Sequence, residues 1–225
     1  MVHVDVLRVF TDENGEHGNQ LGVIDGALVP EEYRQAVARE LGFSETVFVD
    51  DAASGRIRIF TPASELPFAG HPTVGTAWWL RRQGYDVDVL RPPAGEVAVT
   101  RDGDVTRVRA YADWSPVFTW HDLASVAEVE AIDPASVTEG KHYYWTWLDE
   151  ETGTIRSRMC APAIGVAEDE ATGAAAIRLT ARLQRDLVIT QGRGSRLLTT
   201  YEGDGWATVG GTVALDGTRA ATLPA

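Results

Sequence analysis

The stretch ELPFAGHPTVGTA, at residues 65–77, decides the fold, because a weaker copy of it follows downstream. Residues 168–175 read EDEATGAA, and an offset of 98 residues (173 less 75, and 169 less 71) brings the two stretches into register. The matching pairs are then Gly75 with Gly173 and His71 with Asp169. Each copy places one polar side chain and several small residues at the start of an apolar, helix-like pattern. The duplication predicts two related lobes, with a site between two helix N-termini.

A second pair of segments supports the duplication. RIFTPA at 58–63 and RMCAPA at 158–163 lie 100 residues apart. This offset is two residues longer than the offset of 98 between the two helix stretches, so an insertion or deletion of two residues must lie between the two matches. The strands expected from the hydrophobic pattern are 3–10, 20–24, 45–49, 56–60, 86–90, 95–100, 104–111, 115–120, 142–148, 155–160, 186–191, 195–202 and 206–213. The expected helices are 31–41, 72–84 and 171–184, and the Ala/Thr-rich tail at 216–225 is expected to be frayed.

These elements predict an α+β fold with two pseudo-symmetric lobes at 1–113 and 114–225. Each lobe is expected to wrap an antiparallel, β-barrel-like sheet around one central helix that is apolar on most sides.

Composition narrows the possible partners. The net charge of −13 argues against nucleic acid and against anionic membrane surfaces, where binding depends on Lys and Arg. The single cysteine, Cys160, excludes an intrachain disulfide, and the five histidines show no metal-ligand spacing, so we expect no metal. There is no apolar run near the ~20 residues of a membrane span and no signal-peptide layout at the N-terminus, so a cytoplasmic protein is expected.

Several short motifs occur in an order that spans nearly the whole chain. They are RVFT at 8–11, GN at 18–19, SETVFV at 44–49, GHPT at 70–73, EDEATG at 168–173 and QG at 191–192. With these motifs the sequence resembles the PhzF-like phenazine-biosynthesis proteins, which share the diaminopimelate epimerase fold. The resemblance implies a cofactor-independent isomerase, usually a homodimer, with its active site in the cleft between the lobes. In the characterised member, a proton moves on a dihydro-hydroxyanthranilate ring.

The resemblance also assigns roles to individual positions. Glu45 matches the glutamate that moves the proton, and His71 and Asp169 match the residues that support it. The positions implied to bind substrate are Asn19, Gly70, Thr73, Gly173 and Ala174. Ala174 stands where the family commonly has serine, so a hydroxyl that would line the site is missing. The implied partner is a small-molecule carboxylate.

The three candidate catalytic residues each have a physical basis and an alternative. Glu45 opens a strand with an apolar face, where burial would raise its pKa toward the range of a general acid or base; alternatively it is an ordinary glutamate in water. His71 is a candidate to shuttle a proton or to hydrogen-bond a carboxylate; the alternatives are a helix N-cap with no further role and a core histidine that bonds to the backbone. Asp169 orients the substrate or His71, or it only serves as an N-cap.

The two helix starts are candidate anion sites, since free backbone N–H groups point out of them. The alternative for Gly70 and Gly173 is that glycine merely allows close helix packing. Arg193 and Arg196 are candidates to neutralise a carboxylate, and the aromatic strand 142–148 is a candidate floor for a cyclic substrate; surface and core roles are the alternatives. A racemase with a thiol pair is excluded, because neither helix start carries a cysteine.

We therefore expect an isomerase in which Glu45 transfers the proton while His71 and Asp169 orient and polarise the substrate. Two alternatives stay open at this point. One is a different lyase or isomerase chemistry in a pocket altered at Ala174. The other is a non-catalytic carboxylate-binding or scaffold protein on the same fold.

Overall fold

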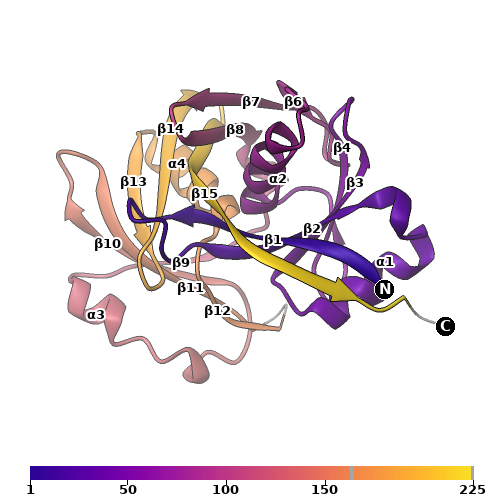
Figure 1. The fold of residues 1–225 in the computed structure, drawn as a ribbon. Helices are drawn as coiled ribbons and strands as arrows, with labels where there is room; N and C mark the ends of the chain where they lie inside the picture. The colour runs from indigo at the N-terminus through magenta and orange to yellow at the C-terminus, as the bar shows by residue number, and fades with distance from the viewer. Residues whose placement is uncertain (163–164, 224–225) are drawn as a thin grey trace.

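Two lobes joined by one long strand make up the molecule, and the computed structural model describes residues 1–162 and 165–223 (Figure 1). The first lobe contains β1 (Val2–Thr11), β2 (Asn19–Asp25), α1 (Glu31–Leu41), β3 (Glu45–Asp51), β4 (Arg56–Phe60), β5 (Glu65–Leu66), α2 (Gly70–Arg82), β6 (Val89–Leu90), β7 (Val97–Asp102) and β8 (Val105–Tyr111). The second contains β9 (Thr119–Asp122), α3 (Val126–Glu130), β10 (His142–Asp149), β11 (Thr154–Ala161), β12 (Val166–Asp169), α4 (Gly173–Leu183), β13 (Leu187–Gln191) and β14 (Ser195–Gly203). The long strand is β15 (Trp206–Ala221). The boundary between residues 113 and 114 stays a prediction.

The internal duplication is visible in the order and direction of the strands. In the first lobe β2 is parallel to β3, and the antiparallel pairs β3–β4 and β4–β5 lead into α2. The second lobe repeats this order with β9, β10, β11, β12 and α4. Helices α1 and α3 form the crossovers, because parallel neighbours cannot be joined by a tight turn. The sheets are otherwise antiparallel as expected, with one more parallel pair between β11 and β13.

The register of the duplication differs from the expected one. Helix α2 begins at Gly70 and α4 at Gly173, so the offset is 103 residues (173 less 70) and not 98. The expected matches of Gly75 with Gly173 and of His71 with Asp169 are therefore wrong. Both stretches are rich in small residues, so an alignment of the two sequences matches almost equally well when it is shifted by several positions.

Two arginine–glutamate pairs show where the offset changes, because Arg58 and Arg158 are 100 residues apart (158 less 58) while their glutamate partners already have the offset of the helices. Arg58 on β4 donates from Nε and Nη2 to the two carboxylate oxygens of Glu65 on β5. Arg158 on β11 donates in the same way to Glu168 on β12, at 2.6 and 2.7 Å. The two glutamates are 103 residues apart (168 less 65). Bidentate pairs of this kind fix the geometry between neighbouring strands. Each lobe uses the same pair to hold the short strand that precedes its central helix.

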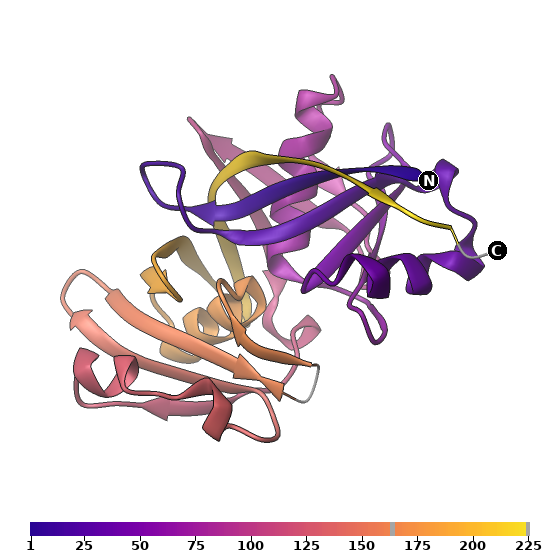
Figure 2. The same cartoon turned by 60° about the horizontal axis from the view of Figure 1, so that its bottom comes forward.

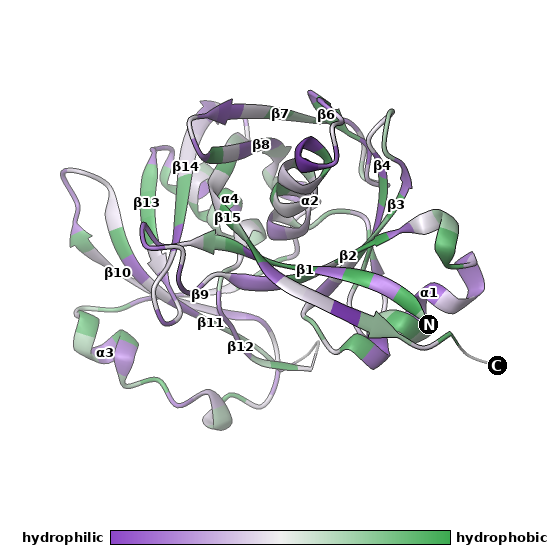
Figure 3. Ribbon diagram, in the orientation of Figure 1, coloured by the Kyte–Doolittle hydropathy of each residue, from purple (hydrophilic) through white to green (hydrophobic). Residues whose placement is uncertain are grey.

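The hydrophobic core extends through both lobes around the two central helices. Leu80 of α2 and Ile177 of α4 are fully buried within one continuous cluster. A second cluster lies between α1 and the other face of the first sheet and includes Val37 and Phe48. Figure 2 shows α1 on that outer face, and Figure 3 shows hydrophobic residues along β1 and β13. Within the described part of the chain, every helix is too short or too polar to cross a bilayer.

The C-terminal residues form a strand, so the expectation of a frayed tail is wrong for residues 216–221. The first part of β15 pairs with β8 and β14, and its last part pairs antiparallel with β1, from Thr212 beside Thr11 to Ala221 beside Val2. In Figure 1 β15 runs in yellow alongside β1. Alanine and threonine alone indicate a weak strand, but an extended partner strand overrides such a local preference. Residues 224–225 lie outside the described residues.

Candidate active site

The N-termini of the two central helices meet between the lobes. A Cβ atom on Gly70 would lie 2.8 Å from the backbone carbon of Gly173, and one on Gly173 would lie 3.0 Å from the Cα atom of Gly70. Any side chain there would clash with backbone, so close packing accounts for both glycines. The N-cap residues, Ala69 and Thr172, make no side-chain cap hydrogen bond. First-turn N–H groups of the two helices therefore point toward the same region.

Glu45 and His71 face each other beside these helix starts. Helix α2 begins two residues earlier than expected, so His71 lies in its first turn and not at the N-cap. The Oε2 atom of Glu45 lies 3.5 Å from the Nε2 atom of His71, and the two side chains are 13% and 4% exposed. Both atoms are buried and have no hydrogen-bond partner among the residues that the structure describes. Buried polar atoms are normally satisfied, so this contact is suited to completion by a bound molecule.

Burial sets the protonation of the two side chains. It raises the pKa of Glu45 to about 7, although the Ser44 hydroxyl and the Lys141 charge favour the ionised form. Burial also lowers the pKa of His71 to about 4, against the nearby Asp169 charge. Near neutral pH, His71 is thus a neutral imidazole and Glu45 populates both its acid and its base form. The expectation that burial raises the Glu45 pKa is confirmed.

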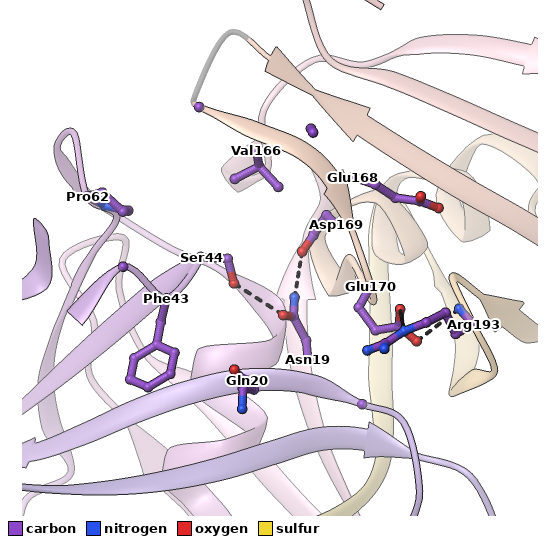
Figure 4. A pocket seen from close by; sticks show the side chains of 14 residues that line it. Asn19, Gln20, Phe43, Ser44, Pro62, Val166, Glu168, Asp169, Glu170 and Arg193 are labelled. Carbon is purple, nitrogen blue, oxygen red and sulfur yellow. Dashed lines mark hydrogen bonds and ion pairs between the residues drawn. The ribbon is translucent and has the colours of Figure 1, made fainter. Parts of the chain in front are cut away.

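Asp169 ends β12 and is held from both sides. The Nδ2 atom of Asn19 donates to its Oδ1 at 2.6 Å, and the Thr172 hydroxyl donates to its Oδ2 at 2.6 Å. Figure 4 shows Asn19 reaching from the first lobe to Asp169, with Ser44 on its other side. The N-cap of α4 is Thr172, so the alternative that Asp169 caps this helix is wrong. Burial, together with the Glu45 charge, raises the pKa of Asp169 to about 6.

Gln191 holds this arrangement in place, although in the sequence it stood out only as part of the QG motif at 191–192. It is fully buried. Its Nε2 donates to the Asp169 carbonyl at 2.9 Å and to the Thr172 hydroxyl at 2.8 Å. Its Oε1 accepts from the Thr172 backbone at 3.2 Å and from the Tyr143 hydroxyl at 3.3 Å. Because Gln191 occupies the acceptor side of the Thr172 oxygen, the Thr172 hydrogen is directed toward Asp169.

A cavity of about 240 Å³ opens beside Glu45, between the lobes; we call it the Glu45 cavity. Its charged lining residues are Glu45, Asp169 and Lys141. The larger side chains of its apolar wall are those of Leu66, Pro67, Phe68, Trp114, Phe118 and Met159. The aromatic strand at 142–148 does not line it, since Tyr143 and Trp145 are buried in the core. Trp114 and Lys141 lie outside the strands expected from the hydrophobic pattern, and Phe118, although it lies in the expected strand 115–120, carried no sign of a place in the site.

The five positions implied to bind substrate lie differently around this site. Ala174 lines the Glu45 cavity. Asn19 lines a second, outer cavity of about 470 Å³, shown in Figure 4, which shares Asp169 with the first. Gly70 and Gly173 pack against each other behind the residues that line the Glu45 cavity. The hydroxyl of Thr73 donates to the Ala69 carbonyl at 2.7 Å inside α2.

The two candidate arginines lie away from the Glu45 cavity. The Arg193 side chain is 78% exposed and pairs with Glu170 at 3.1 Å. Arg196 is 48% exposed and lies 4.0 Å from Glu13. Cys160 is buried on β11, away from both helix starts. The charged groups of the Glu45 cavity are therefore two acids and one lysine.

A cavity between two related lobes, with a neutral histidine and a glutamate whose pKa is raised to about 7, is typical of an active site that moves protons. The model of the phenazine biosynthesis-like protein family matches residues 7–144. Trans-2,3-dihydro-3-hydroxyanthranilate isomerase of Pseudomonas aeruginosa is 32% identical over 240 residues, covering 88% of this chain and 85% of that protein. The chain therefore belongs to the phenazine biosynthesis-like, or PhzF-like, family.

Solved structures agree with this assignment. A PhzF family protein from Enterococcus faecalis superposes with a TM-score of 0.77 at 22% identity, covering 96% of this chain and 97% of that chain. A predicted epimerase from Pseudomonas aeruginosa gives 0.73 at 26% identity, covering 100% of both chains. The α+β fold predicted from the sequence is confirmed, and the protein is an isomerase.

Proposed function

We propose that this isomerase moves a proton within a small ring carboxylate and that Glu45 carries the proton. The strongest support is the buried, unpartnered contact between Oε2 of Glu45 and Nε2 of His71 beside the cavity. In its carboxylate form, Glu45 takes a proton from a ring carbon, and the C–H electron pair enters the conjugated system. In its acid form, it returns the proton to another carbon of that system. The reaction balances without an oxidant, a reductant or a cofactor.

His71 and Asp169 have supporting roles in this proposal. Nε2 of the neutral His71 exchanges a hydrogen bond with Glu45 or with the substrate, according to its tautomer. Asp169 is mostly ionised above its pKa of about 6 and is held by Asn19 and Thr172. It therefore presents a fixed acceptor to an amino or hydroxyl group of the ligand. The cavity of about 240 Å³ suits a single substituted ring.

The substrate to test is trans-2,3-dihydro-3-hydroxyanthranilate, named by the relative from Pseudomonas aeruginosa. A positioned general acid or base contributes ~10²- to 10⁴-fold to a rate, so Glu45→Gln should lower kcat by about that factor. Glu32→Gln is the matched control, because Glu32 is exposed at the start of α1. Turnover in D₂O should place deuterium in the product.

Each outcome of this experiment has a clear meaning. Full activity of Glu45→Gln contradicts the role of Glu45. Binding by the wild-type protein without turnover or deuterium uptake supports the non-catalytic carboxylate-binding alternative instead.

We also propose that the protein is a homodimer, as the resemblance implies. Light scattering after gel filtration should give twice the mass of one chain, and the mass of a single chain would contradict the proposal. A place in phenazine biosynthesis and a cytoplasmic location stay predictions.

A further inference from the structure

Lys141 is the only lysine in the 225-residue chain, and it lines the Glu45 cavity. It directly precedes β10, and its backbone carbonyl accepts a hydrogen bond of 2.8 Å from the Thr119 backbone at the start of β9. Its main chain is thus anchored to the sheet of the second lobe. The Lys141 side chain reaches the cavity from the lobe opposite the one that carries Glu45.

The alternation of the strand explains why this side chain points inward. His142 and Tyr144 stack with His121 on the outer face of the sheet, at ring-centroid distances of 5.2 and 4.4 Å from His121. Tyr143 points the other way and is fully buried. Because successive side chains of a strand alternate between faces, Lys141 shares the inner side with Tyr143. Its half-buried position on the cavity wall agrees with this direction.

Among the side chains that line the Glu45 cavity, that of Lys141 is the one that can offer a positive charge to a bound anion. The other charged lining residues, Glu45 and Asp169, are both acids, and the whole chain carries a net charge of −13. An anionic ligand therefore needs a local positive charge to enter. Lys141 takes part in none of the ion pairs found among the described residues, although its charge is close enough to favour the ionised form of Glu45.

We propose that the Lys141 ammonium binds the substrate carboxylate and thereby sets the orientation of the ring over Glu45; this rests on the proposed function. The ring then lies along the apolar wall formed by Trp114 and Phe118, with the carboxylate at the lysine end and a ring carbon toward Glu45. The side chain of Ala174, at the start of α4, is only a methyl group, so among the side chains that line the cavity the charged contact falls on Lys141. Lys141 is accordingly a specificity residue for ring monocarboxylates and not a proton carrier.

The experiment compares two probes that differ in one charge, anthranilate and its neutral amide, anthranilamide. Calorimetric titration should show that Lys141→Met weakens anthranilate binding by about 10- to 100-fold, the usual range for a hydrogen bond to a charged group. Binding of anthranilamide should change less than threefold. Lys141→Arg should retain most of the preference for anthranilate. Arg39→Met, which removes an exposed positive charge on α1 far from the cavity wall, should affect neither probe.

Three outcomes overturn the inference. They are unchanged anthranilate binding in Lys141→Met, an equal loss of both probes, and no anthranilate binding by the wild-type protein. An equal loss would mean that the side chain only shapes the cavity, and circular dichroism of each variant shows whether it has folded. The test is separate from that of Glu45, because Glu45→Gln measures turnover whereas these titrations measure binding. If Glu45→Gln stays active while Lys141→Met loses anthranilate selectively, the proton-transfer proposal fails and the carboxylate contact stands.

Discussion

The raised pKa of Glu45 makes the stability of the protein depend on pH in a way that one substitution should remove. In the unfolded chain this carboxyl has its ordinary pKa of 4.5, and in the fold its pKa is about 7. Below pH 4.5 it is neutral in both states. Between the two values the unfolded chain releases a proton that the folded chain retains, so stability falls as pH rises. Above pH 7 both states are ionised and the full loss remains.

The size of the effect follows from the two pKa values. One pKa unit corresponds to about 1.4 kcal/mol, so ionised Glu45 should destabilise the fold by about 3 kcal/mol at pH 8 and by under about 1 kcal/mol at pH 5. Glutamine has nearly the same shape and does not ionise. The free energy of unfolding of Glu45→Gln, relative to the wild-type protein, should therefore rise by about 2–3 kcal/mol between pH 5 and pH 8.

Urea unfolding followed by the fluorescence of the seven tryptophans measures this difference at each pH. Glu32→Gln is again the control, because its carboxyl is exposed and its substitution should give the same small difference at both pH values. If the difference between Glu45→Gln and the wild-type protein is equal at pH 5 and pH 8, Glu45 ionises like an ordinary carboxyl. Burial in the fold would then not raise the pKa of Glu45.

Three further perturbations test other parts of the site. In a pH profile of kcat/KM from pH 5 to 9, the rate should rise with a midpoint of about 7 as Glu45 becomes a base, and a rate independent of pH would contradict this role. Asn19→Ala removes the 2.6 Å hydrogen bond to Asp169 and should lower the free energy of unfolding by about 1.5–3 kcal/mol in urea, whereas an unchanged value would show that the bond contributes nothing. Gly70→Ala places a methyl group 2.8 Å from the Gly173 backbone and should destabilise the protein by about 1–3 kcal/mol, so an unchanged melting temperature would mean that the helices separate freely.

Local signals in the sequence predicted the elements that carry strong patterns. Helix α1 begins and ends where expected, because glutamates occupy its first turn and Gly42 ends it in a left-handed conformation, with φ of 68°. Strand β3 begins at Glu45 as expected, and the apolar face of this strand was enough to predict a raised pKa. In these cases the residue and its cause lie within a few positions of each other.

The features that the sequence did not reveal depend on contacts between distant segments. Trp114 and Lys141 come from a region without periodicity, and the pairing of β9 with β10 carries Lys141 to the cavity. Asp169 could be singled out as polar and close to a helix, but its partner Asn19 is 150 residues away in the chain. The register of the duplication also needed the structure, because the helix starts at Gly70 and Gly173 and the paired Glu65 and Glu168 show which residues correspond.

The pairing of β15 with β1 has a consequence for how the protein is made. Strand β1 leaves the ribosome some two hundred residues before its partner, residues 212–221. Until then, one edge of the first sheet has exposed backbone groups that can pair with another chain. Contacts so distant in sequence also slow folding. The first sheet therefore cannot be completed until residues 212–221 have been made, and newly made chains should depend on prompt pairing of β15 with β1, or on a chaperone, to avoid aggregation.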